Sequence, residues 1–180
     1  MRLSRLLVAS GIAASASLLA ACTSVSSSVM VPANLEVEES VGGSVAIETM
    51  GTERQAWVGK RLIDPIEMQS ALREAVLRSK VFDEVVEAGG GDQQLVVSVE
   101  RFEEPEVGLD SHCTLAMRWR LLSGDGSRTV WEEVVSTSET VNTYEGISSE
   151  DRGEAVIAKA IRSNIREGIE RLSIARTEGE

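Results

Sequence analysis

Alternation of hydrophobic and polar residues predicts four β-strands in this chain, at residues 44–50, 94–100, 113–122 and 129–141. The pattern is clearest in the third, where every second residue is apolar: Cys113, Leu115, Met117, Trp119 and Leu121. Successive side chains of a strand point to opposite faces of a sheet, so this strand has one apolar and one polar face. A sheet with one wet face is typical of antiparallel pairing. We therefore expect a mainly antiparallel four-stranded sheet with one face buried.

Two further segments have apolar residues at helical spacing. The first begins at Asp64-Pro65, where aspartate can cap the helix and proline suits its first turn, and it ends near Lys80. The second begins at Ser148 or Ser149 and carries an apolar stripe as far as Leu172. A single apolar stripe has to be buried against another surface, and the apolar face of the sheet provides one. The predicted fold class is α+β, with two helices packed on one face of the sheet in the order β-α-β-β-β-α.

The first residues have the composition of a bacterial export signal. Arg2 and Arg5 precede an apolar run from Leu6 to Ala21, which is too short to span a bilayer comfortably. The run ends in Leu19-Ala20-Ala21-Cys22, which resembles the lipobox of bacterial lipoproteins, in which the cysteine thiol is lipidated and cleavage makes the cysteine the new N-terminus. We therefore predict a signal peptide at residues 1–21 and lipidation of Cys22. An ordinary signal peptide with a chance cysteine is the alternative.

The charge of the chain limits how it can attach to a membrane. The full sequence carries −11, and removing residues 1–21, with two arginines and no acidic residue, brings the mature chain to −13. Nucleic acid and anionic headgroups repel such a protein, so the acyl chains on Cys22 have to provide the attachment. Residues 22–42, poor in large apolar side chains, are predicted to form a flexible tether spanning about 25 Å. A single domain then covers residues 43–173, and residues 174–180 form a frayed tail.

The sequence contains little that could carry out catalysis. Cys113 has no cysteine partner once Cys22 is lipidated, and its apolar neighbours favour a buried thiol. His112, the one histidine of the chain, is the adjacent strand residue and is expected on the opposite face. The acidic loop at 103–110 lacks the spacing of a calcium loop, and Gly89–Gly91 lacks the residues of a phosphate-binding loop. We expect no enzyme activity, no cofactor and no metal site.

Three residues are candidates for contact with a partner. Trp57 is a large aromatic residue in a loop, where it either anchors an interface or packs over the sheet edge. Arg118 and Arg120 lie on the polar face of their strand, where they either meet an acidic partner or pair with glutamates on neighbouring strands. The sequence leaves both pairs of alternatives open.

Several segments resemble a group of small bacterial periplasmic lipoprotein domains. These segments are Ala71-Leu72, Ser79-Lys80-Val81-Phe82, Gln94 to Glu100, Trp119-Arg120-Leu121-Leu122, Val130-Trp131-Glu132 and Asn164-Ile165. The pattern is similar to the lipopolysaccharide-assembly lipoprotein, the penicillin-binding-protein activator lipoproteins, the N-terminal domain of the Tol-system translocation protein, and the auxiliary lipoproteins of lipid-transport ABC systems. The resemblance covers residues 43–172 and implies a shared fold. The matching positions are mostly core residues, so no ligand-binding residue is carried over.

These observations favour a binding protein of the cell envelope. Cys22 is followed by Thr23 and not by aspartate, which in similar lipoproteins would signal retention in the inner membrane, so we predict a location in a Gram-negative outer membrane, facing the periplasm. We expect a non-catalytic accessory subunit of an envelope assembly or transport system, whose partner is a larger envelope protein. One alternative is a carrier of lipid or glycan, which needs an apolar cleft between helices and sheet. A less favoured one is an envelope hydrolase that uses acidic residues.

Overall fold

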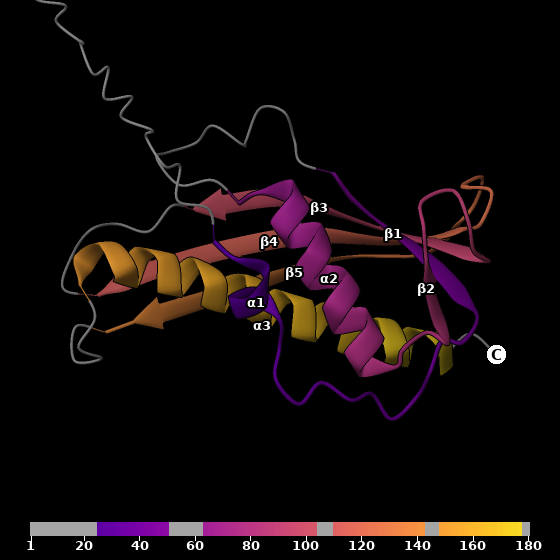
Figure 1. The fold of residues 1–180 in the computed structure, drawn as a ribbon, viewed down its shortest axis with the longest axis horizontal. Helices are drawn as coiled ribbons and strands as arrows, with labels where there is room; N and C mark the ends of the chain where they lie inside the picture. The colour runs from indigo at the N-terminus through magenta and orange to yellow at the C-terminus, as the bar shows by residue number, and fades with distance from the viewer. Residues whose placement is uncertain (1–24, 51–62, 104–109, 143–147, 178–180) are drawn as a thin grey trace, which may run out of the picture.

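Over the residues that the structure describes, the chain forms a five-stranded mixed sheet with three helices (Figure 1). The computed structural model describes residues 25–50, 63–103, 110–142 and 148–177. The strands are β1 (Ser44–Met50), β2 (Glu84–Val86), β3 (Gln93–Glu103), β4 (Ser111–Ser123) and β5 (Thr129–Val141). The helices are α1 (Ser27–Met30), α2 (Pro65–Ser79) and α3 (Ser149–Thr177). The predicted α+β class and the order of the main elements are confirmed.

The sheet differs from the prediction in its strand count and in its pairing. Its strand order is β2-β1-β3-β4-β5, so β2 is an additional edge strand. β1 pairs in parallel with both β2 and β3, whereas β3, β4 and β5 are antiparallel to one another. Parallel neighbours need a crossover connection, and α2 supplies it between β1 and the strands that follow. The sheet is therefore mixed: its two longest strand pairings are antiparallel, as predicted, and its two shorter ones are parallel.

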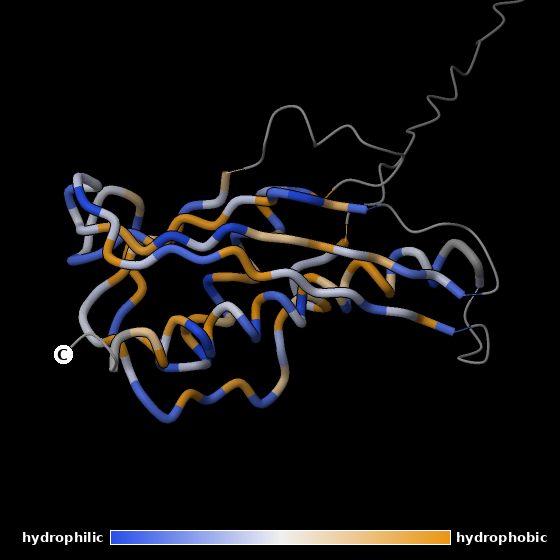
Figure 2. Tube along the Cα trace, turned by 180° about the vertical axis from the view of Figure 1, so that it is seen from behind, coloured by the Kyte–Doolittle hydropathy of each residue, from blue (hydrophilic) through white to orange (hydrophobic). Residues whose placement is uncertain are grey.

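The helices cover one face of the sheet, and the core lies between the two layers. α2 contacts β1, and α3 contacts β4 and β5. The alternate apolar residues of β4 all point into this core, as the sequence predicted. Figure 2 shows the same division, with hydrophobic positions recurring along the strands and hydrophilic turns at one end of the sheet.

A buried polar contact ties α3 to the centre of the sheet. Trp119 is completely buried, and its Nε1 donates a hydrogen bond to Asn164 Oδ1 at 3.1 Å. The Asn164 amide nitrogen donates to the Val135 carbonyl at 2.8 Å, so the asparagine bridges β4 and β5 from the helix. Such a pair has to be satisfied, because an unpaired buried polar group costs about 1–3 kcal/mol.

The signals that delimit α2 act as the sequence indicates. Asp64 caps the helix, and its Oδ1 accepts a hydrogen bond from the Ile66 amide at 2.8 Å. Pro65 occupies the first turn, where its missing amide hydrogen is no loss. The helix ends at Ser79 and is followed by the capping residue Lys80, which has a φ of 58° in the left-handed region. That conformation reverses the chain and leads it towards β2.

The segment before β1 is not a free tether over residues 25–41. Four apolar side chains in it are buried against the domain: Val25, Met30, Leu35 and Val41. α1 contacts both α2 and α3. Backbone pairing adds to this contact, because the Val41 amide donates to the Val81 carbonyl at 2.7 Å. We call residues 25–43 the N-terminal belt, because they run across the outer side of the helix layer.

Candidate functional site

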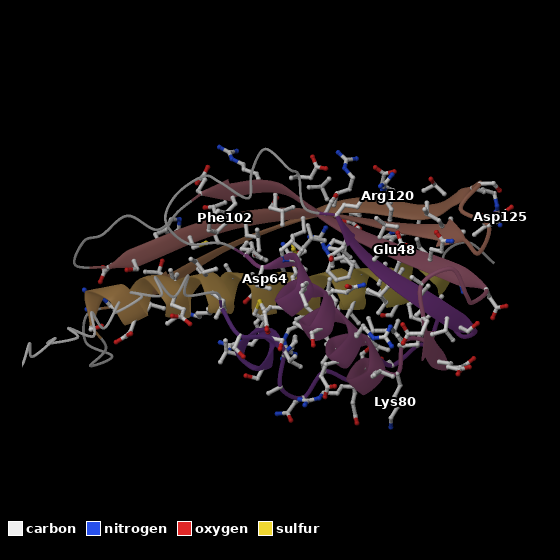
Figure 3. All side chains as sticks on the ribbon, turned by 45° about the horizontal axis from the view of Figure 1, so that its top comes forward. Glu48, Asp64, Lys80, Phe102, Arg120 and Asp125 are labelled. Atoms are coloured by element: carbon white, nitrogen blue, oxygen red, sulfur yellow. The ribbon has the colours of Figure 1, made fainter. Side chains whose placement is uncertain are left out.

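The polar face of the sheet, opposite the helices, is the part of the molecule where the predicted interface arginines lie. In the structure described, no helix packs on it. We call it the open face and define it by these partly or fully exposed residues: Glu48, Met50, Ser98, Glu100, His112, Thr114, Arg118, Arg120, Glu132, Val134 and Ser138. Figure 3 shows Arg120 on the side of the sheet away from the helices. The prediction that Arg118 and Arg120 share this face is confirmed.

Arg118 is held by two glutamates from the neighbouring strands. Its Nε lies 2.7 Å from Glu100 Oε1 on β3, and its Nη1 bonds to Glu132 on β5. The hydrogen bond from Arg118 holds the pKa of Glu100 below its ordinary value. The same two bonds raise the pKa of Arg118, so this side chain stays charged. Arg118 thus follows the alternative of cross-strand glutamate pairing, and its charge is balanced within the chain.

Arg120 lies one step along the same face and has a different environment. It lies opposite Val96 on β3 and opposite Glu132 on β5. Val96 in turn lies opposite Glu48 on β1. Among the described residues it forms no salt bridge, and its Nε is buried with no hydrogen-bond partner. A guanidinium presents a fixed fork of donors that suits a carboxylate. The charge of Arg120 helps to lower the pKa of Glu100, but no salt bridge among the described residues holds its guanidinium.

The single histidine belongs to a group of hydroxyls at the far end of the open face. His112 Nδ1 lies 3.1 Å from Thr140 Oγ1, and Nε2 lies 3.1 Å from Ser138 Oγ. Cys113 lies on the opposite face, where burial raises the pKa of its thiol to about 12. The predicted separation of these two neighbours is confirmed. A cysteine nucleophile activated by this histidine is excluded by that geometry.

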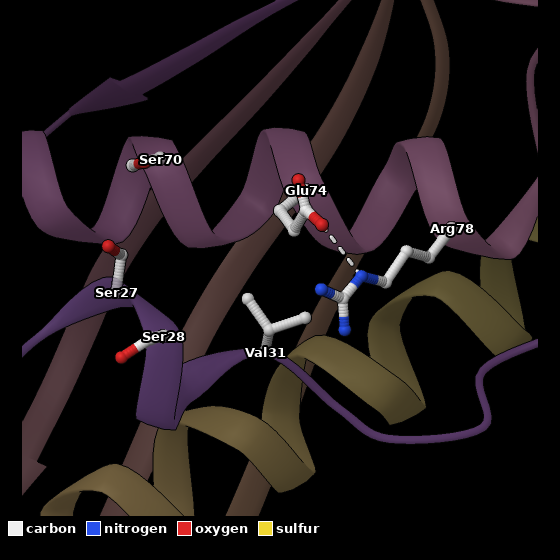
Figure 4. A pocket seen from close by; sticks show the side chains of 6 residues that line it. All are labelled: Ser27, Ser28, Val31, Ser70, Glu74 and Arg78. Atoms are coloured by element: carbon white, nitrogen blue, oxygen red, sulfur yellow. Dashed lines mark hydrogen bonds and ion pairs between the residues drawn. The ribbon is translucent and has the colours of Figure 1, made fainter.

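In the part of the chain that the structure describes, two shallow grooves lie on the helix side. One, of about 260 Å³, runs between α1 and α2, where Arg78 is bonded to Glu74 at 2.7 Å (Figure 4). The other, of about 380 Å³, lies between the N-terminal belt and the end of α3 and contains Glu36, Glu38, Glu39 and Glu170. All four carboxylates are exposed. A catalytic carboxylic acid needs an apolar, buried setting to hold its proton, so this groove gives the hydrolase alternative no support.

Other predicted features bear on the site less directly. Cys22 and Trp57 lie outside the described residues, so their roles stay predictions. Where the chain is described, no group of His, Cys, Asp or Glu side chains is placed to hold a metal ion. None of the described helices is both long enough and apolar enough to cross a bilayer. Sequence reasoning missed the docking of the N-terminal belt, because its buried apolar residues follow neither the helical nor the strand period.

Comparison with known proteins identifies the fold. No protein-family model matches the chain, and no curated protein matches its sequence. Among solved structures, protein XCC0632 from Xanthomonas campestris, of family DUF330, superposes with a TM-score of 0.60 at 14% identity, covering 82% of this chain and 92% of that one. Protein CT253 from Chlamydia trachomatis superposes with a TM-score of 0.53 at 12% identity, covering 77% and 99%. Rare lipoprotein B from Shewanella oneidensis gives 0.47 at 7% identity, covering 74% and 97%. At these identities the first two likenesses show a shared fold.

Proposed function

We propose that this protein is a lipid-anchored lipoprotein of the outer membrane that faces the periplasm and binds a larger envelope protein through its open face. The anchor rests on Leu19-Ala20-Ala21-Cys22 and on the basic and apolar residues before it. The binding role rests on the open face, and above all on Arg120. Arg120 is partly exposed and forms no salt bridge with the described residues, so an acidic side chain from a partner could pair with the accessible part of its guanidinium.

The anchor is tested by fractionation of cells that produce the wild type or Cys22→Ser. We expect the wild type in a membrane fraction, because two or more acyl chains give stable attachment. We expect that fraction to be the outer membrane, because Thr23 and not aspartate follows Cys22. The variant should appear in the soluble periplasmic fraction. An exported variant that stays in the membrane would contradict lipid anchoring. A wild type found in the inner membrane would contradict only the outer-membrane assignment.

The docking surface is tested by site-specific photocrosslinking in cells. Val134 on the open face and Leu77 on α2 are similarly exposed, at 42% and 53%, so a crosslinker at Leu77 is a matched control. We expect a protein adduct from position 134, absent from position 77, and lost when Arg120→Glu is added. Arg78→Glu, which reverses an arginine on α2 already bonded to Glu74, should leave the adduct intact. Adducts of equal yield at both positions would refute docking through the open face.

The carrier alternative has less support in the described part of the chain. A lipid carrier needs an apolar cleft, and for this fold the place for it is between the helices and the sheet. That space is filled by side chains with no exposure, among them Trp119, Leu115 and Ile161. Lipid analysis of the purified protein separates the two roles. Stoichiometric bound lipid, beyond the acyl chains on Cys22, would favour the carrier.

A further inference from the structure

The docked N-terminal belt leaves very little free chain between the anchor and the body. Val25 is 3% exposed and belongs to the core. It follows Cys22 by three residues, which span at most about 11 Å when fully extended. The headgroup layer of one leaflet is itself roughly 5–7 Å thick. A cysteine lipidated at the membrane surface would therefore hold Val25 within or just outside that layer.

The N-terminal belt is held against the body from Val25 onwards. The short spacer between Cys22 and Val25 therefore limits how far the whole domain can lie from the membrane. Met30, at the end of α1, is completely buried and belongs to the core. The Ser27 amide donates to Glu67 Oε2 at 2.6 Å, which joins α1 to the first turn of α2. Arg162 on α3 donates to the Val29 carbonyl at 3.2 Å. Both helices of the body are thus connected to the residues that follow the anchor.

Exposed apolar side chains gather at the same end of the molecule. Val29 on α1 is 45% exposed, Ile66 in the first turn of α2 is 75% exposed, and Met50 at the end of β1 is 48% exposed. The elements that carry them adjoin, because Thr49 Oγ1 donates to the Pro65 carbonyl at 3.2 Å and Ser27 bonds to Glu67. Figure 1 shows the start of α2 near the end of β1. We call this region the anchored end.

We propose that the anchored end lies against the headgroup layer of the membrane that holds the lipidated Cys22, so that Ile66 and Val29 contact lipid. The inference rests on the proposed lipidation of Cys22. We assign a bilayer as the partner of this surface because Val25, the first described residue, follows the proposed lipid anchor at Cys22 by only three residues. The domain is then held at the membrane in one orientation and not suspended on a long tether.

The test measures distance to headgroups at two positions on one helix. Cysteine is introduced at Ile66 or at Leu77, which is also exposed but lies eleven residues further along α2, or about 16 Å. Each is labelled with a fluorophore; the native Cys113 is buried and Cys22 carries lipid, so neither competes. The mature lipidated protein is placed in vesicles of zwitterionic phosphatidylethanolamine and phosphatidylcholine that contain a nitroxide-headgroup lipid. We expect several-fold stronger quenching at position 66 than at position 77.

A second variant tests the spacer as the cause. Ten Gly and Ser residues inserted between Ser24 and Val25 give a flexible span of about 17 Å, so quenching at position 66 should fall towards that at position 77. Equal quenching at both positions in the unextended protein would overturn the proposed orientation. If the insertion leaves the quenching at position 66 unchanged, the short spacer is not what holds this end at the membrane. Flotation of the protein with vesicles is measured separately, and its absence would refute the lipid anchor and not the geometry.

Discussion

Gly168→Ala should destabilise the domain, although helix propensity alone predicts the opposite. Gly168 lies within α3, where alanine is preferred over glycine by about 1 kcal/mol. A Cβ at this position would lie 2.3 Å from Cε2 and 2.4 Å from Cζ2 of Trp119. Carbon atoms in contact are normally about 3.5–4.0 Å apart, so the ring or the helix has to move.

The indole has nowhere to move. It has no exposed surface, and its Nε1 is bonded to Asn164, one helical turn before Gly168 on the same helix. Overpacking of a well-filled core costs about 1–3 kcal/mol, and a contact this short belongs at or above the upper end of that range. After the gain in helix propensity, we expect a net loss of about 2 kcal/mol in the free energy of unfolding. For a chain of this size, that lowers Tm by about 4–8 °C.

The assay is urea and thermal unfolding of the mature chain carrying Cys22→Ser, which removes the lipid. Trp119→Leu provides the control, because a smaller side chain leaves room for the new Cβ. In that background Gly168→Ala should be neutral or stabilising, and the double-mutant cycle should give a coupling energy of about 2 kcal/mol. A Gly168→Ala variant as stable as the wild type, with no coupling to Trp119, would refute the packing argument.

Three further predictions concern the belt, the buried thiol and the open face. Met30→Ala should lower the free energy of unfolding by about 2–5 kcal/mol because the side chain is completely buried, and a change below about 0.5 kcal/mol would restore the free-tether prediction. Cys113, whose thiol has its pKa raised to about 12 by burial, should react with a maleimide only after unfolding in urea; rapid labelling of the native protein would contradict its burial. The lowered pKa of Glu100 stabilises the fold above the carboxyl's unfolded-state pKa, and this contribution is lost as pH falls through the folded-state pKa. Arg118→Ala should therefore flatten the acid side of the profile of stability against pH, and identical profiles for variant and wild type would show that the ion pair contributes nothing.

The sequence determined the elements whose signals are local. The long strands β4 and β5 show an alternation of period two, and α2 and α3 show apolar stripes with recognisable caps. These patterns depend on residues within one or two turns of each other, so the chain itself contains them. The same alternation placed Arg118 and Arg120 on one face and separated His112 from Cys113.

The tertiary structure decided the features that depend on residues far apart in the chain. β2 has three residues, too few to show a period, and it exists because β1 offers it a parallel partner. Val25 and Met30 are buried by helices that follow them by dozens of residues, which no local pattern reports. The register of β4 between β3 and β5 gives Arg118 two glutamate partners and leaves the Nε of Arg120 without one. Two arginines of identical sequence character thus differ in their salt bridges because pairing across strands, unlike alternation along a strand, is set by non-local contacts.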